Sequence, residues 1–194
     1  MLPIGPLMME HRLIERMIAI IKDELTKIRD KKEFNSVFID NAVDFIRTYA
    51  DQTHHGKEED ILFRELKKKE ISEEHEVIMN ELIEEHKFAR ETTGKLVSAK
   101  ENFLDGNEDE IKKVIDAIEK LVEFYPKHIE KEDEYFFIPV MDYFTDEEKN
   151  SLLQEGQAFD RRMIHRRYRD FVYKLIDRRD LSIKKLKKNW VNYF

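Results

Sequence analysis

Two copies of a His-x-x-x-Glu motif, in distant parts of the chain, are the residues best suited to chemistry. One is the segment His54-His-Gly-Lys-Glu58, and the other is His128-Ile-Glu-Lys-Glu132. On a helix, side chains four residues apart lie on one face, about one turn from each other. An imidazole and a carboxylate placed in this way can bind the same metal ion, or the carboxylate can bridge two ions. Two bridging carboxylates on facing helices would set the ions about 3.5–4 Å apart, a usual distance in two-metal sites.

The register of the first motif is ambiguous, because the next pair of residues, His55 and Glu59, has the same spacing. With about 100° of rotation per residue, the apolar stripe of this helix centres close to His54 and Glu58. His55 lies on the flank of the stripe, from which it can still reach the site. Glu59 points away, so we expect it to contact the ligands from outside or to face the solvent.

Two other expected helices each place a histidine within an apolar stripe, His11 in the first and His86 in the third. Antiparallel helices would bring both to the level of the two motifs, although the level of His86 depends on where its helix begins. A lone histidine in an apolar stripe usually has a structural role, but here several coincide. The predicted metal ligands are His11, His54, His55, Glu58, His86, His128 and Glu132.

The two remaining histidines fit a metal site poorly. His75 lies eleven residues from His86, about 16 Å along the helix axis, which is too far for one site. We expect His75 to pack at the start of its helix. His165 lies among three arginines in the sequence, and this is an unfavourable place for a ligand of a cation.

Hydrophobic residues repeat at spacings of three and four along most of the chain, as on the buried faces of amphipathic helices. Ser72 has the features of a helix N-cap, and Thr145 with Glu148 has those of a capping box. Pro126 lies inside the fourth stripe, where it removes a backbone donor and should kink or loosen the helix. The expected helices span about 7–28, 34–69, 72–105, 111–139 and 145–178, followed by an amphipathic tail at 182–194.

The composition also favours an all-α protein. Apolar residues make up 41% of the 194 residues and charged residues 40%, with only 5 Gly and 4 Pro; this suits long amphipathic helices. The short connections predict an up-down-up-down four-helix bundle at 1–140, with an additional C-terminal helix and tail at 141–194 packed on it. The chain has no cysteine, which excludes disulfides, iron–sulfur clusters and thiol catalysis. Without a signal peptide or an apolar run of membrane-spanning length, we expect a cytoplasmic protein.

Charge is unevenly distributed along the chain. Residues 161–194 hold twelve Lys or Arg and three Asp or Glu, a balance of +9, which leaves −16 on the first 160 residues. We favour a basic C-terminal segment docked on an acidic bundle over contact of the tail with an anionic membrane surface or another partner. We expect no nucleic-acid partner, and a homodimer is an open alternative.

Taken together, these residues resemble the hemerythrin-like, or HHE cation-binding, domain over roughly 7–140. The resemblance implies a four-helix bundle that holds two iron ions, bridged by the carboxylates of Glu58 and Glu132. The histidines that match ligand positions of the family are His11, His54, His86 and His128, and His55 matches a position that is a ligand in some members.

The chain departs from the oxygen-carrying members of that family in its third helix. Those proteins have two histidines close together there, whereas this chain has only His86. A set of five His and two Glu leaves coordination more open, which suits redox chemistry or sensing better than plain oxygen carriage. Ferritin-like di-iron bundles use Glu-x-x-His instead, a spacing that none of the seven histidines shows.

We therefore predict a non-haem di-iron protein that handles or senses dioxygen, peroxide, nitric oxide or iron itself. An oxo or hydroxo bridge would complete the iron pair, and zinc or manganese would accept many of the same ligands. Whether the protein is an enzyme is left open. The alternative is a helical interaction module whose buried histidines are structural or whose metal only staples the fold. Five histidines within apolar stripes and two matched carboxylates favour the metal site over this alternative.

Overall fold

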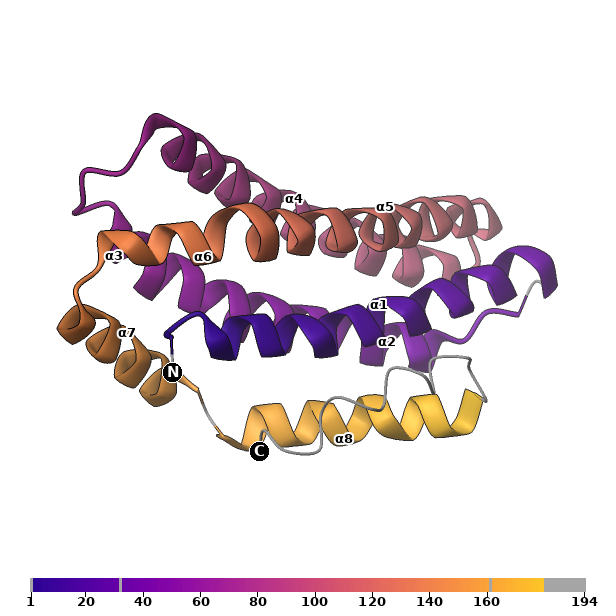
Figure 1. Ribbon diagram of the computed structural model, residues 1–194. Helices are drawn as coiled ribbons and strands as arrows, with labels where there is room; N and C mark the ends of the chain where they lie inside the picture. The colour runs from indigo at the N-terminus through magenta and orange to yellow at the C-terminus, as the bar shows by residue number, and fades with distance from the viewer. Residues whose placement is uncertain (1, 32, 161, 180–194) are drawn as a thin grey trace.

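The computed structural model describes residues 2–31, 33–160 and 162–179, and every regular element in this part of the chain is helical. The all-α prediction is therefore confirmed. Long helices lie side by side, and the shorter α7 and α8 lie along one side of them (Figure 1). In chain order, the elements are α1 (Gly5–Lys31), α2 (Ser36–Phe45), η1 (Ile46–His55), η2 (Glu58–Phe63), α3 (Arg64–Leu66), α4 (Glu73–Leu104), η3 (Glu108–Glu110), α5 (Ile111–Glu130), η4 (Lys131–Phe136), α6 (Phe137–Val140), η5 (Met141–Tyr143), α7 (Asp146–Phe159) and α8 (Arg162–Arg179).

The second and fourth expected helices contain π-helical segments. In the second helix, η1 and η2 are π-helical, and the two residues between them, Gly56 and Lys57, have helical backbone angles. In the fourth helix, α5 continues through Pro126 and is followed by the π-helical η4. The hydrogen bonds of a π-helix join residues five apart, and such segments occur frequently at functional sites. Here all three of them contain residues of the two His-x-x-x-Glu motifs.

The predicted helix starts are confirmed by their hydrogen bonds. The Ser72 hydroxyl accepts a hydrogen bond from the backbone N–H of His75 at the start of α4. At the start of α7, Thr145 and Glu148 form the reciprocal pair of a capping box. After α4 the chain turns at Gly106, whose φ of 101° lies in the left-handed region that glycine adopts without steric cost.

The expectation of one fifth helix over 145–178 is wrong. The structure has two helices, α7 and α8, separated at Asp160, whose backbone is extended (φ −67°, ψ 110°). Tertiary contacts account for the break. The Asp160 carboxylate accepts a hydrogen bond from Lys57 at 2.5 Å, and the ring of Phe159 lies directly over Gly56. Both contacts would be lost if α7 continued as a straight helix.

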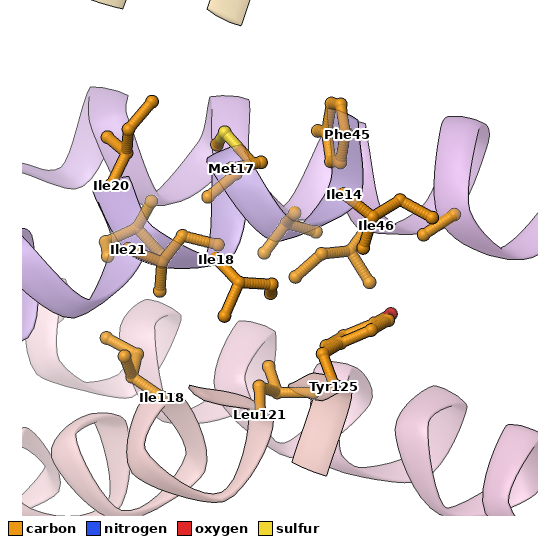
Figure 2. Close-up of a cluster of buried hydrophobic side chains, with 14 of the residues drawn as sticks. Ile14, Met17, Ile18, Ile20, Ile21, Phe45, Ile46, Ile118, Leu121 and Tyr125 are labelled. Carbon is orange, nitrogen blue, oxygen red and sulfur yellow. The ribbon is translucent and has the colours of Figure 1, made fainter. Parts of the chain in front are cut away.

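The core consists of two apolar clusters with a polar layer between them. The larger cluster includes Ile14 of α1, Ala50 of η1, Leu96 of α4 and Tyr125 of α5, and part of it is shown in Figure 2. The smaller cluster includes Leu7 of α1, Phe63 of η2, Leu82 of α4 and Phe136 of η4, so the same four stretches of chain also contribute to it. Each segment therefore passes from one cluster to the other, and the predicted ligands lie in the sequence between these points. Each buried large apolar side chain contributes roughly 1.5–3 kcal/mol to folding, so both ends of the layer are firmly held.

The C-terminal helix α8 joins the larger cluster. Tyr168, Val172 and Ile176 are buried there, and α8 packs against α1 and η1. The expected tail at 182–194 lies outside the described residues. Among the helices that are described, none combines the length and the apolar character needed to cross a membrane.

Candidate metal centre

The structure brings all seven predicted ligands together in the polar layer, each at most 2% exposed. They form two adjoining groups, and within each group the donor atoms lie within 4.8 Å of one another. One group contains His11, His54, Glu58 and Glu132, and the other contains His55, His86 and His128. The seven side chains come from α1, η1, η2, α4, α5 and η4.

The two carboxylates lie between His11 and His54 on one side and the second group on the other, with one oxygen atom of each facing each side. For Glu58, Oε1 lies 3.3 Å from His54 Nε2, and Oε2 lies 3.4 Å from His86 Nε2. For Glu132, Oε2 lies 3.1 Å from His11 Nε2, and Oε1 lies 3.4 Å from His128 Nε2. Metal–ligand bonds of about 2.1 Å at right angles place neighbouring donor atoms about 3.0 Å apart. The observed spacings therefore suit two cations that share both carboxylates.

Aromatic rings line the layer. The Phe137 ring stacks on His11 at 5.6 Å between centroids, Phe63 lies parallel to His86 at 6.1 Å, and Phe124 stacks on His128 at 5.0 Å. The His55 ring is parallel to that of His86 at 3.9 Å. These contacts fix the planes of the imidazoles and keep bulk water away from them.

Four of the five histidines have a carboxylate partner on the ring nitrogen that faces away from the layer. The contacts from Nδ1 are His11 to Asp133 (2.8 Å), His54 to Glu10 (2.8 Å), His86 to Glu59 (2.6 Å) and His128 to Glu85 (2.8 Å). An ionised carboxylate can only accept a hydrogen bond, so the Nδ1 atom beside it carries the proton and donates it. Burial raises the pKa of Glu10 to about 7, but the charge and the hydrogen bond of Lys57 oppose that shift and favour the ionised form. The lone pair is then on Nε2, which faces the layer. A carboxylate on the far nitrogen is the usual arrangement for a metal-bound histidine, because it orients the ring and raises its basicity.

These carboxylates were not among the predicted site residues, yet the sequence contains a signal for them. Each is the immediate neighbour of a predicted ligand and contacts the histidine of a different helix. Glu10 precedes His11, Glu59 follows Glu58, Glu85 precedes His86 and Asp133 follows Glu132. The contacts run from α1 to η1, from η2 to α4, from α4 to α5 and from η4 back to α1, which closes a ring around the bundle.

The π-helical segments explain how both residues of the His54–His55 pair face the layer. A π-helical turn holds more residues than an α-helical turn, so consecutive side chains are separated by a smaller rotation than the one assumed from the sequence. For the same reason Glu59 reaches His86. The sequence left two positions open for Glu59, contact with a ligand or exposure to solvent, and the structure shows the contact with a ligand. His55 is the exception in the set, because its nearest carboxylate atom among the described residues is Asp51 Oδ1 at 3.4 Å.

Burial sets the protonation of the site. It lowers the pKa of His11, His54 and His55 and brings that of His128 to about 4, so these rings are neutral at pH 7, the form that binds metals. Burial also raises the pKa of Glu58 and Glu132 well above the usual range, and the proximity of further carboxylates adds to this shift. The two carboxyl groups therefore tend to hold protons unless a cation lies beside them.

The polar atoms that face the layer form a donor set that fits a cation. The Nε2 atoms of His11, His54, His86 and His128, and all carboxylate oxygens of Glu58 and Glu132, are buried without a hydrogen bond from the described residues. Buried polar groups are rarely left in this condition, since it costs about 1–3 kcal/mol for each of them. Imidazole nitrogen and carboxylate oxygen, without thiolate, are donors suited to iron, zinc or manganese.

The other two histidines lie outside this layer. His75 Nδ1 contacts the hydroxyl of Tyr143 at 2.8 Å, at the start of α4. His165 of α8 is buried, with Nδ1 at 3.2 Å from the Tyr49 hydroxyl and Nε2 at 3.1 Å from Asp160 Oδ2. The neighbouring arginines in the sequence did not reveal this environment, because it is formed by other elements.

Comparisons with curated proteins and with solved structures find no match for this chain. A family model does match: the one described as "Hemerythrin HHE cation binding domain", over residues 2–138. The matched region covers more than half of the chain, contains all seven predicted ligands and ends within α6. Both α7 and α8 follow it. The chain belongs to the hemerythrin HHE cation-binding domain family.

Proposed function

We propose that the protein binds two iron ions in the polar layer, with Glu58 and Glu132 as bridging ligands. His11 and His54 would hold one ion, and His55, His86 and His128 the other. The observation that carries this proposal is the position of the two carboxylates, each with one oxygen toward His11 or His54 and one toward His86 or His128. A structural role for the histidines would not require both carboxylates to face imidazoles without other hydrogen-bond partners.

The division of the ligands suggests where a small molecule would bind. The ion beside His11 and His54 has one imidazole fewer than its neighbour, so an external ligand has more room to coordinate there. A bound iron pair supplies reversible redox chemistry and affinity for dioxygen, peroxide or nitric oxide. The protein residues hold the ions, keep four ring protons on Nδ1 and exclude water through Phe63, Phe124 and Phe137. We therefore propose a protein that handles or senses such a small molecule, or iron itself.

The arrangement of the chain supports two coarser proposals. We propose that α1, the segment 36–66, α4 and the segment 111–140 run up-down-up-down, as their side-by-side packing suggests. We also propose that residues 1–140 form the metal-binding bundle and that residues 141–194 are an extension of it, since the family match ends at residue 138.

Metal analysis of the protein purified in air tests the proposed function. We expect two irons per chain and a near-ultraviolet absorption band of a coupled di-iron centre. Addition of azide, a small anion that coordinates iron, should change this band. A folded protein that is colourless and retains no iron after loading with ferrous salt would contradict the proposal and favour a helical interaction module.

Replacement of Glu59 by alanine is expected to weaken iron retention by about 10–100-fold, the usual effect of removing a hydrogen-bond partner of a metal-bound histidine. Glu59 accepts the Nδ1–H of His86 at 2.6 Å. Burial alone would raise the pKa of Glu59, but its hydrogen bonds with His86 and Arg90 outweigh burial and lower that pKa to about 2. Competition with a chelator measures the effect. Asp60→Ala is the matched control, because Asp60 is the adjacent acidic residue and is exposed. Equal retention in the two variants would exclude this role.

Loading the metal-free protein with ferrous iron at pH 7 is expected to release protons. Burial raises the pKa of Glu58 and Glu132, so they bind protons that a cation displaces, whereas His128, with a pKa of about 4, has none to lose. Apparent affinity should therefore rise with pH until the raised carboxyl pKa values are passed. Anaerobic calorimetry in buffers of different ionisation enthalpy counts the protons. Glu132→Gln should release fewer, and loading without any release would contradict the expectation.

A further inference from the structure

A chain of buried polar contacts connects the candidate metal centre with the C-terminal helices. It begins at Glu10, whose Oε2 accepts the Nδ1–H of His54 at 2.8 Å. The other oxygen of Glu10 accepts a hydrogen bond from the ammonium group of Lys57. Glu10 and Lys57 are each only 4% exposed, which is rare for these residue types unless they are paired. The position of His54 is thus tied to an ion pair between α1 and the motif segment.

The second half of this chain is supplied by residues outside the family match. Lys57 Nζ also donates to Asp160 Oδ1 at 2.5 Å, and Asp160 Oδ2 lies 3.1 Å from His165 Nε2. His165 Nδ1 contacts the Tyr49 hydroxyl at 3.2 Å, which leads back into η1. Burial alone would raise the pKa of Asp160, but His165 and Lys57 outweigh it and lower the pKa, so the carboxylate is ionised. Its negative charge compensates Lys57.

The break between α7 and α8 is what allows these contacts. Asp160 occupies the extended position between the two helices, and the adjacent Phe159 lies against Gly56, one residue before Lys57. The nearest carbon of the Phe159 ring would lie 3.0 Å from a Cβ at position 56. The junction is therefore seated on the segment between His54 and Glu58.

Glu10, Asp160 and His165 have donor atoms within 4.8 Å of one another and would by themselves suggest a third cation site. Lys57 argues against it, because its ammonium group already donates to both carboxylates. A metal ion would have to displace a buried lysine. The cluster is better explained as a support for the site next to it.

We propose that Asp160 and His165 are positioning residues of the metal centre. Acting through Lys57 and Glu10, they hold His54 in the orientation and tautomer that binds metal. When the Asp160 charge is removed, Glu10 becomes the sole anionic partner of Lys57 and its hydrogen bond with His54 weakens. The extension then contributes to retention of the metal beside His11 and His54, although it supplies no ligand. This inference rests on the proposed function, because it assumes that His54 binds metal.

The test compares Asp160→Asn with Glu155→Gln in the full-length, iron-loaded protein. Glu155 also anchors α7, through two hydrogen bonds with Arg64 at 2.8 and 2.9 Å, but it is not connected to Glu10 or His54. Loss of the two irons to a ferrous chelator is followed with time. For Asp160→Asn we expect one of the two irons to leave faster, by up to about tenfold. Removal of a direct hydrogen-bond partner of a metal ligand usually weakens metal binding by at least about tenfold, and Asp160 acts one step further away. Glu155→Gln should retain the wild-type rates.

A double-mutant cycle distinguishes positioning from general destabilisation. If Asp160 acts through Glu10, then Asp160→Asn should have little further effect on iron loss in a Glu10→Gln background. Additive effects would overturn the proposal. Wild-type rates of iron loss in both Asp160→Asn and His165→Asn would also overturn the proposal. His165→Asn is included in case Asp160→Asn fails to fold.

Cobalt(II) loading provides a spectroscopic measurement that a merely structural role would not change. The visible bands of cobalt depend on its ligands, so Asp160→Asn should shift them, Asp160→Glu should restore them in part, and Glu155→Gln should leave them as in the wild type. Unshifted bands in Asp160→Asn would overturn the proposal. If the wild-type protein binds neither iron nor cobalt, the proposed function itself fails, and this result is distinguishable from all the others.

Discussion

Replacement of Glu132 by alanine is expected to remove both irons, or to leave at most one of them weakly bound. Each oxygen of this carboxylate faces a different imidazole, with Oε2 at 3.1 Å from His11 Nε2 and Oε1 at 3.4 Å from His128 Nε2. The variant therefore loses a ligand of both ions and half of the negative charge that Glu58 and Glu132 place between them. Repulsion between two cations about 3.5–4 Å apart is then poorly compensated. Iron per chain, from elemental analysis and native mass spectrometry, measures the loss.

A bridging ligand can be distinguished from a terminal one by comparison within the site. Glu58→Ala should reproduce Glu132→Ala, whereas His54→Ala should affect mainly one of the two ions. Glu134→Ala is the matched control, because Glu134 lies two residues further along η4 and is exposed. If Glu132→Ala kept two irons per chain, the carboxylate would not be a bridging ligand and the proposed assignment of the ligands would be wrong.

Removal of the metals is expected to cost the protein a large part of its stability. Binding at one site with the free metal at a thousand times its dissociation constant stabilises the folded state by about 4 kcal/mol. For a chain of this length, that corresponds to a rise of about 8–16 °C in the melting temperature. Differential scanning calorimetry of the metal-free and the iron-loaded protein under nitrogen measures the shift. Equal melting temperatures would mean that the site gains no stabilisation from metal.

Replacement of Glu132 by leucine is expected to make the protein more stable than the wild type without metal and less stable than the wild type with iron. In the metal-free protein, Glu132→Leu replaces a buried carboxyl group that has no hydrogen bond from the described residues, which should stabilise the fold by about 1–3 kcal/mol. In the presence of iron, the same variant should melt below the wild type, since it has lost the bridge. Glu134→Leu at the exposed position is the control. A Glu132→Leu protein less stable than the wild type without metal would contradict this account.

The sequence was sufficient to find the residues of the layer because their signal is local. Two side chains four residues apart share a helix face whatever surrounds them, so the spacing identified Glu132, and the spacing together with the apolar stripe selected Glu58 over Glu59. The same reasoning left open whether Glu59 contacts a ligand or faces the solvent, because it assumed a uniform α-helix where the chain forms η1 and η2. A π-helical segment depends on how the interior is packed, and no composition or period in the sequence marks it. Whether the seven residues bind metal remains a prediction.

The break at Asp160 could not be predicted for a related reason. The capping box of Thr145 and Glu148 predicts the start of α7 from the sequence. The end of α7 has no glycine in the left-handed region and no proline that would predict it. It is determined by partners distant in sequence, Lys57 for the carboxylate and Gly56 for the Phe159 ring. Tertiary contacts of this kind override helix propensity, which is only a weak preference for each residue.

The closed ring of carboxylate–imidazole contacts means that the height of each helix is set by its neighbours rather than by the loops. Every one of the four segments both gives an acceptor and receives one, and a slip of one turn, about 5.4 Å, would break two contacts at once. The connecting turns at 67–72 and 105–110 therefore do not have to set the relative heights of the helices. Apart from Ser72, which caps α4, and Gly106, whose φ favours glycine, these turns can vary in length and composition, so new chain can be added there without turning an imidazole away from the layer.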